Sequence, residues 1–404
     1  MQYDILIVGG GAAGFFAAIN AAEMNPGAKI AILERGKEVL SKVRISGGGR
    51  CNVTHAEFLP KELVKNYPRG EKELRGPFHQ FMTGDTIAWF EERGIELKIE
   101  EDGRMFPVSD TSETIINCFL SEAERLKVQI LKNESVKSLV WKNPYWKVST
   151  PKSTLSASKV LIATGSNPKI WNFLEKLGHS ISPAVPSLFT FNIKDKRIAD
   201  LPGISTYAEV KVQGAKLQDE GPLLITHWGL SGPAILRLSA WGARELHDMD
   251  YTFRIQVNWL PGFSSEEILE KMKALKFELA KQQVLKNAQF ELPKRLWQNL
   301  VIAAKIEPTV TWADINKDQL LDLAQQLTEA VFKVNGKSTF KEEFVTAGGI
   351  DLKEVNFKTF ESKVLKNLFF AGEVLNIDAV TGGFNFQNAW TGGFLAAKAM
   401  TSTA

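Results

Sequence analysis

Apolar runs alternate with small-residue and amphipathic stretches in the N-terminal part of the chain. Residues 5–8 form one continuous apolar run, and residues 29–33 form a second that ends in Glu34. Continuous apolar runs are typical of parallel strands that are buried on both faces of a sheet. Between them, small residues at helical spacing are followed by an Asn-Pro-Gly stop at residues 25–27. The pattern therefore predicts a strand–helix–strand unit.

The remaining periodicity predicts further strands and helices. Apolar strands are expected at residues 159–162 and 368–370, an apolar helix at 387–400, and two strands around a Lys/Asn/Pro turn within 139–148. We place Val136 at the end of an earlier strand. From about residue 187 to 212 apolar and polar positions alternate, which indicates antiparallel strands. Helical spacing follows at residues 264–279, 293–305 and 317–332.

A glycine motif fills the turn of the strand–helix–strand unit. Gly9 permits the tight turn, Gly11 lets the backbone approach a pyrophosphate, and Gly14 lets the helix pack close to the strand. The free N–H groups at the helix start would then face the anion. Glu34 stands twenty positions after Gly14, where an acid would accept hydrogen bonds from a ribose. The dinucleotide-binding residues expected here are Gly9, Gly11, Ala12, Ala13, Gly14, Glu34 and Arg35.

The glycine motif fits FAD or NAD, and segments elsewhere in the chain decide between them. A second glycine-rich loop covers residues 46–52, where a bare backbone can approach a flat ring or a phosphate and Arg50 and Lys42 add positive charge. The strand at 159–162 runs into Ala-Thr-Gly at 163–165. The strand at 368–370 is followed by Gly-Glu at 372–373 and by Thr-Gly-Gly-Phe-Asn at 381–385.

Together these segments resemble the FAD-binding domain of glutathione-reductase-like flavoproteins with two dinucleotide-binding domains. More narrowly, residues 46–52, 103–107, 226–233 and 372–385 resemble the HI0933/YhiN-like family of NAD(P)/FAD-dependent oxidoreductases. The resemblance spans nearly the whole chain and implies FAD as the cofactor. The further FAD-binding residues that it implies are Lys42, Gly48, Gly49, Arg50, Cys51, Asn52, Val136, Ala163, Thr164, Gly165, Gly372, Glu373, Gly383, Phe384 and Asn385.

Two segments depart from the family pattern. Residues 166–171 read Ser-Asn-Pro-Lys-Ile-Trp where a Gly followed by Ser-Tyr-Pro and a glycine-rich turn is usual. Residues 376–379 read Asn-Ile-Asp-Ala where Asp-x-Asp-Gly is usual. Both departures fall near the expected flavin and substrate face, so they weaken inference about the substrate more than inference about the cofactor.

The implied fold class is α/β, with a Rossmann-like FAD-binding domain that is split in sequence. Its two parts are expected at residues 1–186 and 346–404, because the glycine motif is N-terminal and the ribitol-binding motif is C-terminal. A β-rich insert is expected at 187–262 and 336–345, and a helical subdomain at 263–335.

Composition and charge exclude several classes of protein. The 49 basic and 46 acidic side chains leave a formal charge of +3, which argues against a nucleic acid as partner. The two cysteines cannot form a disulfide framework, and no metal-ligand spacing occurs, so we expect no metal. The uncharged stretch at residues 5–22 is interrupted by glycines and lacks a basic flank, so we expect no membrane segment and a cytoplasmic protein.

Three side chains are candidates for chemistry beside the flavin. His227 lies in a Gly/Ser/Pro-rich turn, and histidine suits proton transfer near neutral pH, although a structural hydrogen bond within the turn is the alternative. Arg104 could bind an anionic substrate or the flavin, or be a surface arginine. Cys51 lies in the second glycine loop, but Cys118 is 67 residues further on, so a buried thiol is favoured over a dithiol relay.

The expected activity is transfer of a hydride or electrons between flavin and a small organic substrate. No second GxGxxG follows residue 14, so any reduction by NAD(P)H would need transient binding without a Rossmann fold of its own. The alternatives are a flavin-dependent RNA-modifying enzyme and a flavin-binding protein without turnover.

Overall fold

The chain folds into two compact units. The computed structural model describes residues 1–339 and 345–402. The first unit combines Met1–Val185 with Val345–Ala404, and the second is Pro186–Phe344. Residues 340–344, which belong to the expected second segment of the β-rich insert, lie outside the described residues.

Five parallel strands form the centre of the first unit. Their order is β21 (Leu368–Phe370), β9 (Thr154–Ile162), β1 (Gln2–Val8), β2 (Ile30–Glu34) and β6 (Gln129–Lys132). Antiparallel β19 (Val355–Asn356) and β20 (Glu361–Ser362) extend the sheet beyond β21. Because strands from both ends of the chain join one sheet, the prediction of a Rossmann-like fold split in sequence is confirmed.

The apolar run at the start of the chain explains the central position of β1. Ile5 pairs with Ile30 of β2 on one side and with Lys159 of β9 on the other, and all four residues from Ile5 to Val8 are buried. Such a strand has no solvent face, so it carries no polar alternation. Since β1, β2, β9 and β21 are parallel, their carboxyl ends lie at one edge of the sheet.

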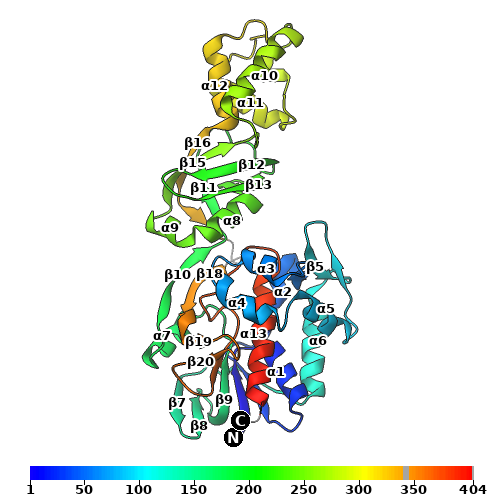
Figure 1. Ribbon diagram of the computed structural model, residues 1–404, viewed down its shortest axis with the longest axis vertical. Helices are drawn as coiled ribbons and strands as arrows, with labels where there is room; N and C mark the ends of the chain where they lie inside the picture. Colours follow the sequence, from blue (N-terminus) through cyan, green and yellow to red (C-terminus); the bar gives the residue numbers. More distant parts are fainter. Residues whose placement is uncertain (340–344, 403–404) are drawn as a thin grey trace. The chain divides into compact units, whose positions relative to one another are not determined.

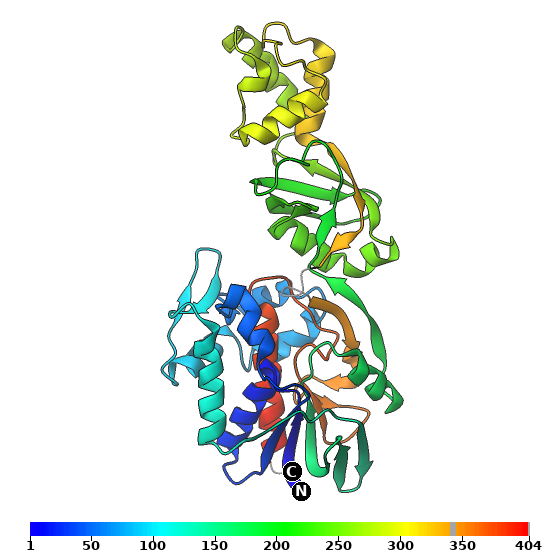
Figure 2. The same cartoon turned by 180° about the vertical axis from the view of Figure 1, so that it is seen from behind.

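Two helices from opposite ends of the sequence pack against each other beside this sheet. Figures 1 and 2 show α1 (Ala12–Met24) in blue next to α13 (Phe384–Thr401) in red, and the two helices are in contact. Their close approach requires small side chains, since a Cβ on Gly393 would lie 3.0 Å from the carbonyl oxygen of Ala13. The ring of Phe16 lies 5.2 Å from that of Trp390 in α13 and 4.6 Å from that of Trp89, so aromatic side chains pack against α1 from more than one element.

The remaining elements of the first unit surround this core. The predicted strands around the Lys/Asn/Pro turn are present as the hairpin of β7 and β8, and β8 pairs with β9. Val136, however, does not end a strand: β6 stops at Lys132, and Val136 lies in the segment that follows. The other elements are α2 (Ser41–Gly49), β3 (Thr54–His55), α3 (Pro60–Leu63), α4 (Glu71–Phe78), α5 (Thr83–Glu91), β4 (Leu97–Ile99), β5 (Arg104–Pro107), α6 (Ser112–Arg125), β7 (Ser138–Lys142), β8 (Tyr145–Ser149), α7 (Pro168–Lys176), β10 (Ile181–Ser187) and β18 (Val345–Ile350).

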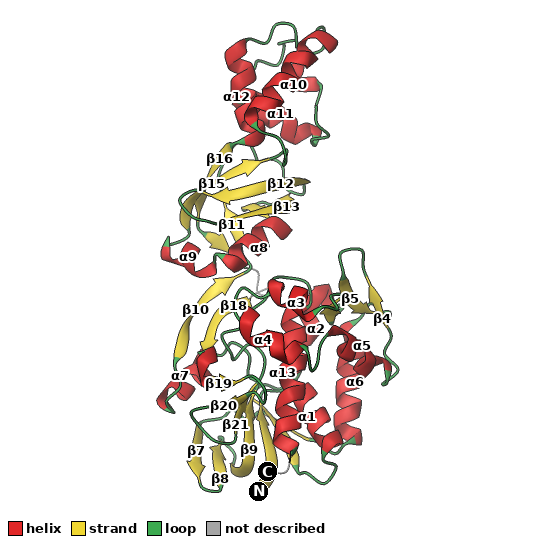
Figure 3. Ribbon diagram, viewed as in Figure 1, coloured by secondary structure: helices red, strands yellow, loops and turns green. Residues whose placement is uncertain are grey.

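The second unit contains a seven-stranded antiparallel sheet. Its order is β16-β15-β12-β13-β14-β11-β17, and Figure 3 shows these strands in yellow together with the helices of the same unit in red. The elements are β11 (Thr190–Asn192), β12 (Ser205–Val212), β13 (Gln218–Ile225), β14 (Gly229–Ser231), α8 (Pro233–Trp241), α9 (Ala243–Asp248), β15 (Thr252–Asn258), α10 (Ser265–Glu278), α11 (Lys294–Ala303), α12 (Lys317–Thr328), β16 (Ala330–Asn335) and β17 (Lys337–Ser338).

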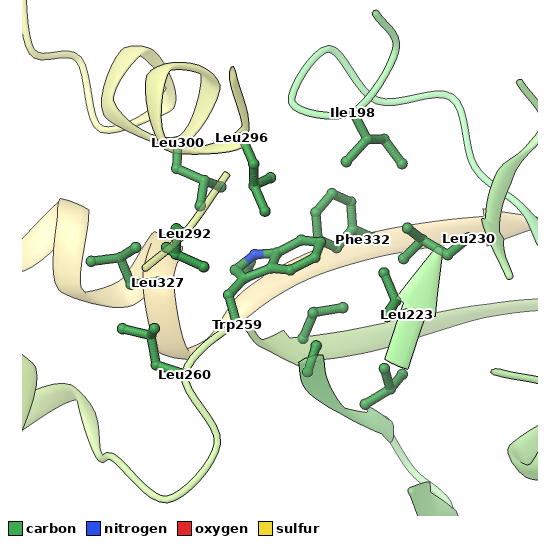
Figure 4. Packing of buried hydrophobic residues seen from close by; sticks show 14 of the residues in the cluster. Ile198, Leu223, Leu230, Trp259, Leu260, Leu292, Leu296, Leu300, Leu327 and Phe332 are labelled. Atoms are coloured by element: carbon green, nitrogen blue, oxygen red, sulfur yellow. The ribbon is translucent and has the colours of Figure 1, made fainter. Parts of the chain in front are cut away.

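One hydrophobic core joins the sheet and the helices of the second unit. Trp259 is 1% exposed, and Figure 4 shows it among Leu296 of α11, Leu327 of α12, Phe332 of β16 and Leu223 of β13. The residues expected as a helical subdomain therefore share their core with the strands of the insert.

The predicted helix at residues 317–332 is too long. α12 ends at Thr328, and β16 begins at Ala330 with alternating burial. Its Phe332 pairs with Ile255 of β15 and its Val334 pairs with Phe253. Pairing with β15 therefore decides the structure of this segment against its helical spacing. A strand buries alternate side chains against the core, and this burial stabilises the strand over a helix here.

Candidate cofactor site

The glycine motif after β1 forms the tight turn that the sequence predicts. Gly9 has φ +116°, and a Cβ on it would lie 2.3 Å from the carbonyl oxygen of Ala163, at the end of β9. A Cβ on Gly14 would lie 2.0 Å from the carbonyl oxygen of Gly9, so helix α1 meets the strand where only glycine fits. A Cβ on Gly11, by contrast, would meet nothing within 4 Å. The backbone at Gly11 is thus open to a ligand, while Gly9 and Gly14 are closed by packing.

Glu34 ends β2 and connects the glycine turn to the loop that follows β2. Its Oε2 accepts a hydrogen bond of 2.9 Å from the N–H of Gly10, and its Oε1 accepts one of 2.7 Å from the N–H of Gly36. The carboxylate is therefore oriented by two backbone donors. It keeps further lone pairs that a ribose hydroxyl could use.

A pocket opens at this edge of the sheet, beside the ends of β1 and β2. Gly9, Glu34, Arg35, Val136 and Thr164, all predicted nucleotide ligands, line it together; the other lining residues are Val8, Leu33, Glu134, Ser135, Asn167 and Ile170. Among the residues that the structure describes, two buried oxygens of this lining have no hydrogen-bond partner: Thr164 Oγ1 and Glu134 Oε2. Buried polar atoms are normally paired, so these oxygens fit a site whose partner is a bound molecule.

Three predicted residues from distant segments meet near the same edge. The Nζ of Lys42 lies 2.5 Å from Oε2 of Glu373. A Cβ on Gly165 would lie 3.5 Å from that same oxygen and 4.0 Å from that same Nζ. The Ala-Thr-Gly strand end, the start of α2 and the C-terminal Gly-Glu therefore converge.

The second glycine-rich loop interrupts α2 and carries the backbone on to Asn52. Gly47 and Gly48 are left-handed, with φ +56° and +68°, and a Cβ on Gly48 or on Gly49 would meet nothing within 4 Å. The side-chain amide of Asn52 is oriented so that both its nitrogen and its oxygen are hydrogen-bonded. In this orientation the oxygen accepts a hydrogen bond of 2.9 Å from the N–H of Gly383. This contact fixes the loop to the start of α13.

Cys51 is part of this loop but is not available for redox chemistry. Its side chain is fully buried, and burial raises the pKa of the thiol to about 12. A thiol that stays protonated is a poor nucleophile. Cys118 is also a free, buried cysteine, and contact of Cys51 with FAD stays a prediction.

Two of the three predicted arginines, Arg50 and Arg104, are engaged by acidic side chains. Arg50 Nη1 lies 2.6 Å from Oε1 of Glu100, and the Arg50 guanidinium lies 3.9 Å from the ring centroid of Phe106. Arg104 Nε lies 2.7 Å from Oδ2 of Asp102. In the structure their charges are thus balanced within the protein rather than offered to an anion.

The C-terminal motif at the start of α13 contacts His55 and the loop that precedes the helix. Phe384 begins α13, and its ring stacks on that of His55 with centroids 4.5 Å apart. His55 Nδ1 lies 3.1 Å from the carbonyl oxygen of Gly382. The side chain of Asn385 hydrogen-bonds to the N–H and the carbonyl of Ala379 at 3.1 and 3.2 Å, which closes the loop before the helix. Gly372 lies beside α1, since its Cβ would lie 3.3 Å from that of Ala13.

Sequence reasoning missed two groups that shape this region. His55 was not singled out, because a lone histidine has no spacing signal; the stacking partner arrives 329 positions later. Asp378 is completely buried and forms a bidentate ion pair with Arg69. The departure at residues 376–379 signalled something unusual there, but the partner Arg69 could not be inferred from it.

His227 lies in the second unit, in the turn between β13 and β14. It is exposed, as is the neighbouring Trp228, whose N–H lies 3.2 Å from Oγ1 of Thr226. Its neighbour Gly229 is left-handed and packs tightly, since a Cβ would lie 2.2 Å from the carbonyl oxygen of Phe191. The turn is therefore tightly packed at Gly229 while His227 is exposed, and a catalytic role for His227 stays a prediction.

Taken together, the split Rossmann-like sheet and the converging glycine turns define a flavoprotein of the FAD-binding class. The chain belongs to the HI0933-like family: the model described as "HI0933-like protein Rossmann domain" matches residues 3–399. This result confirms the resemblance and places the protein among FAD-dependent oxidoreductases.

Two relatives are similar to this chain over almost the full length of both proteins. The chain is 27% identical to the 3-dehydro-bile acid delta(4,6)-reductase of Clostridium scindens, covering 97% of this chain and 98% of that protein. It is 28% identical to the ribosomal RNA dihydrouridine synthase of Escherichia coli, covering 98% of each.

Solved structures show the same fold at low identity. The 3-ketosteroid-delta4-(5alpha)-dehydrogenase of Rhodococcus jostii RHA1 matches with a TM-score of 0.52 and 13% identity, over 100% of this chain and 97% of that one. The 3-ketosteroid delta1-dehydrogenase of Sterolibacterium denitrificans matches with a TM-score of 0.52 and 10% identity, over 99% of each.

Residues 1–339 and 345–402 contain no group of three or more His, Cys, Asp or Glu side chains that could hold a metal ion. Within the same residues, no helix has the length and apolar character needed to span a bilayer.

Proposed function

We propose that this protein is an FAD-dependent oxidoreductase that acts on a carbon–carbon double bond conjugated to a carbonyl group in a small organic molecule. The names of the two relatives support this bond type. A 3-dehydro-bile acid delta(4,6)-reductase acts on ring double bonds near a keto group, and dihydrouridine differs from uridine by one saturated bond beside a carbonyl. Such a reduction adds one hydride equivalent and one proton across the double bond.

The observation that carries the proposal is the convergence of segments from both ends of the chain. Gly11 and the two loop glycines Gly48 and Gly49 leave the backbone open. The buried Thr164 Oγ1, which has no hydrogen-bond partner among the described residues, supports a polar ligand at this position. We assign the pyrophosphate to the start of α1, the ribose to Glu34, the adenine to the segment at Val136, and the ribitol to Glu373 with Lys42. The remaining assigned contacts are those expected from the sequence, at Ala12, Ala13, Ala163, Gly165, Gly372, Gly383, Phe384 and Asn385.

The chemistry that FAD supplies when bound is two-electron transfer. The residues of this chain orient it and exclude competing reactions. A proton donor is also required, and His227 is our candidate for that role. Arg104 is our candidate for a different role, binding an anionic substrate. In that role its ion pair with Asp102 would be replaced by an ion pair with the substrate.

NAD(P)H is our proposed reductant, oxidised to NAD(P)⁺ in each turnover. Because the chain has a single GxGxxG motif, we propose that the nicotinamide cofactor binds transiently and leaves before the organic substrate reacts.

An anaerobic spectral titration tests the proposal. Full-length protein should be isolated yellow, or should take up FAD when it is supplied, and its visible bands should bleach on addition of NADH or NADPH. Addition of an α,β-unsaturated ketone should then restore the bands and yield the saturated ketone. Colourless protein that takes up no FAD would overturn cofactor and function together. Bound FAD without turnover by any donor would leave a flavin-binding protein without activity.

Ribosomal RNA is a second candidate substrate, favoured by the 28% identity to the E. coli dihydrouridine synthase. The near-neutral charge of this chain offers little for binding a polyanion. Incubation of unmodified ribosomal RNA with the protein and NADPH distinguishes the two substrates. A mass increase of two hydrogens on a uridine would favour RNA, and an unchanged RNA alongside enone turnover would favour the small molecule.

A further inference from the structure

Glu134 is an acidic residue of the nucleotide pocket to which neither the sequence motifs nor the family resemblance gave a role. It follows β6, and its backbone N–H donates a 2.8 Å hydrogen bond to the carbonyl oxygen of Glu34. The segment that carries it is thereby fixed to the end of β2. Its side chain lies in the lining of the same pocket and is 11% exposed.

The two oxygens of this carboxylate are in different situations. Oε1 lies 3.9 Å from Nζ of Lys152, a side chain that is 56% exposed and that also donates to the carbonyl of Lys132. Oε2 is buried and has no hydrogen-bond partner among the described residues. Burying a carboxylate oxygen without a donor is costly, so the site favours a bound group that donates a hydrogen bond.

In Glu34, the other acidic side chain of the pocket lining, both oxygens have a hydrogen-bond donor. Both oxygens of Glu34 already accept a backbone N–H, from Gly10 and from Gly36. Glu134 is therefore the acidic side chain of this lining with an oxygen still lacking a donor. It stands next to Ser135 and Val136, on the side of the pocket that we assign to the adenine.

We propose that Oε2 of Glu134 accepts a hydrogen bond from the 6-amino group of the FAD adenine and makes the pocket selective for that base. The inference rests on the proposed binding of FAD at this site. The 6-amino group is the hydrogen-bond donor on the edge of adenine, and a purine without it has none at that position. A ligand lacking the donor leaves the carboxylate oxygen unpaired, and sites built around a hydrogen bond discriminate strongly against such ligands.

A ligand–variant cycle tests this assignment. The full-length apoprotein is titrated with FAD and with the FAD analogue in which hydrogen replaces the 6-amino group, and dissociation constants are read from quenching of flavin fluorescence. We expect the wild type to bind FAD at least about tenfold more tightly than the analogue. Glu134→Ala should bind the two ligands about equally, and Glu134→Gln, which keeps an acceptor oxygen, should recover part of the preference. Glu124→Ala, at an exposed acid on α6, is the matched control and should behave as wild type.

The outcomes separate this inference from the proposed function. Equal affinity of the wild type for both ligands would overturn the role of Glu134 while leaving FAD binding intact. A tenfold preference that persists in folded Glu134→Ala would also overturn it, since the donor must then pair elsewhere. Failure of the wild type to bind either flavin would instead refute the proposed function. Because the wild-type comparison needs no variant, the assignment stays testable even if Glu134→Ala does not fold.

Discussion

Lys42 and Glu373 form an ion pair across 331 positions of the chain, with Nζ of Lys42 2.5 Å from Oε2 of Glu373. The lysine side chain is 60% exposed and the glutamate 18%. The pair thus joins the start of α2 to the segment after β21, and both residues are assigned to the ribitol of FAD.

Loss of this ion pair should lower the retention of FAD more than the stability of the fold. Exposed ion pairs contribute about 0–1 kcal/mol to stability, so Glu373→Ala apoprotein should unfold at nearly the wild-type denaturant concentration. Its flavin-to-protein ratio after purification should fall several-fold, because Glu373 is the proposed ribitol ligand. Lys65→Ala removes a surface pair with Glu62 and serves as the control. Full flavin retention by Glu373→Ala would remove Glu373 from the site.

The glycine motif predicts two opposite phenotypes for the same substitution. A Cβ at Gly14 would lie 2.0 Å from the carbonyl oxygen of Gly9, so Gly14→Ala should lower the free energy of unfolding by about 3 kcal/mol. A Cβ at Gly11 meets open space, so Gly11→Ala should fold with wild-type stability but bind FAD poorly. Chemical denaturation and flavin titration of both variants provide the measurement. A Gly11→Ala variant that binds FAD normally would contradict the pyrophosphate assignment.

The buried His179 makes stability depend on pH. Burial lowers the pKa of this ring below the ordinary histidine value, and the 3.0 Å contact with Glu354 opposes the shift without cancelling it. The unfolded chain therefore takes up a proton first as the pH falls below about 6.5, so this contribution to stability is present above that pH and is lost below it.

Denaturant unfolding between pH 7.5 and about 5.5 measures this contribution. His179→Gln should show a shallower loss of unfolding free energy over that interval than the wild type, whereas His247→Gln, at an exposed position, should retain the wild-type slope. Parallel slopes for the wild type and His179→Gln would show that His179 has no such role.

The proposed proton donor gives a kinetic prediction. His227→Gln should lower kcat for the double-bond substrate by about 10²-fold or more, as expected for loss of a general acid, while the rate of bleaching by NADPH stays unchanged. His247→Gln, in the same unit and hydrogen-bonded to Tyr251, should leave both rates at the wild-type level. Equal loss of both rates in His227→Gln would indicate a structural role in the turn.

Sequence patterns predicted elements well where burial follows local periodicity. The strand at residues 5–8 lies at the centre of the sheet. The helical spacing from residue 264 corresponds to α10, which Ser264 caps by accepting a hydrogen bond from the N–H of Glu267. The patterns failed at residues 330–332, where pairing with β15 replaced the expected helix, and at Val136, which lies beyond the end of β6.

The sequence by itself determined the class of fold and the nucleotide motif, because glycine spacing and apolar runs act over a few residues and need no distant partner. Only the tertiary structure decided which side-chain atoms already have partners within the protein. It balanced Arg50 with Glu100, engaged both oxygens of Glu34, and left one oxygen of Glu134 without a donor among the described residues. Those outcomes depend on the competition between contacts that form only when distant segments pack together.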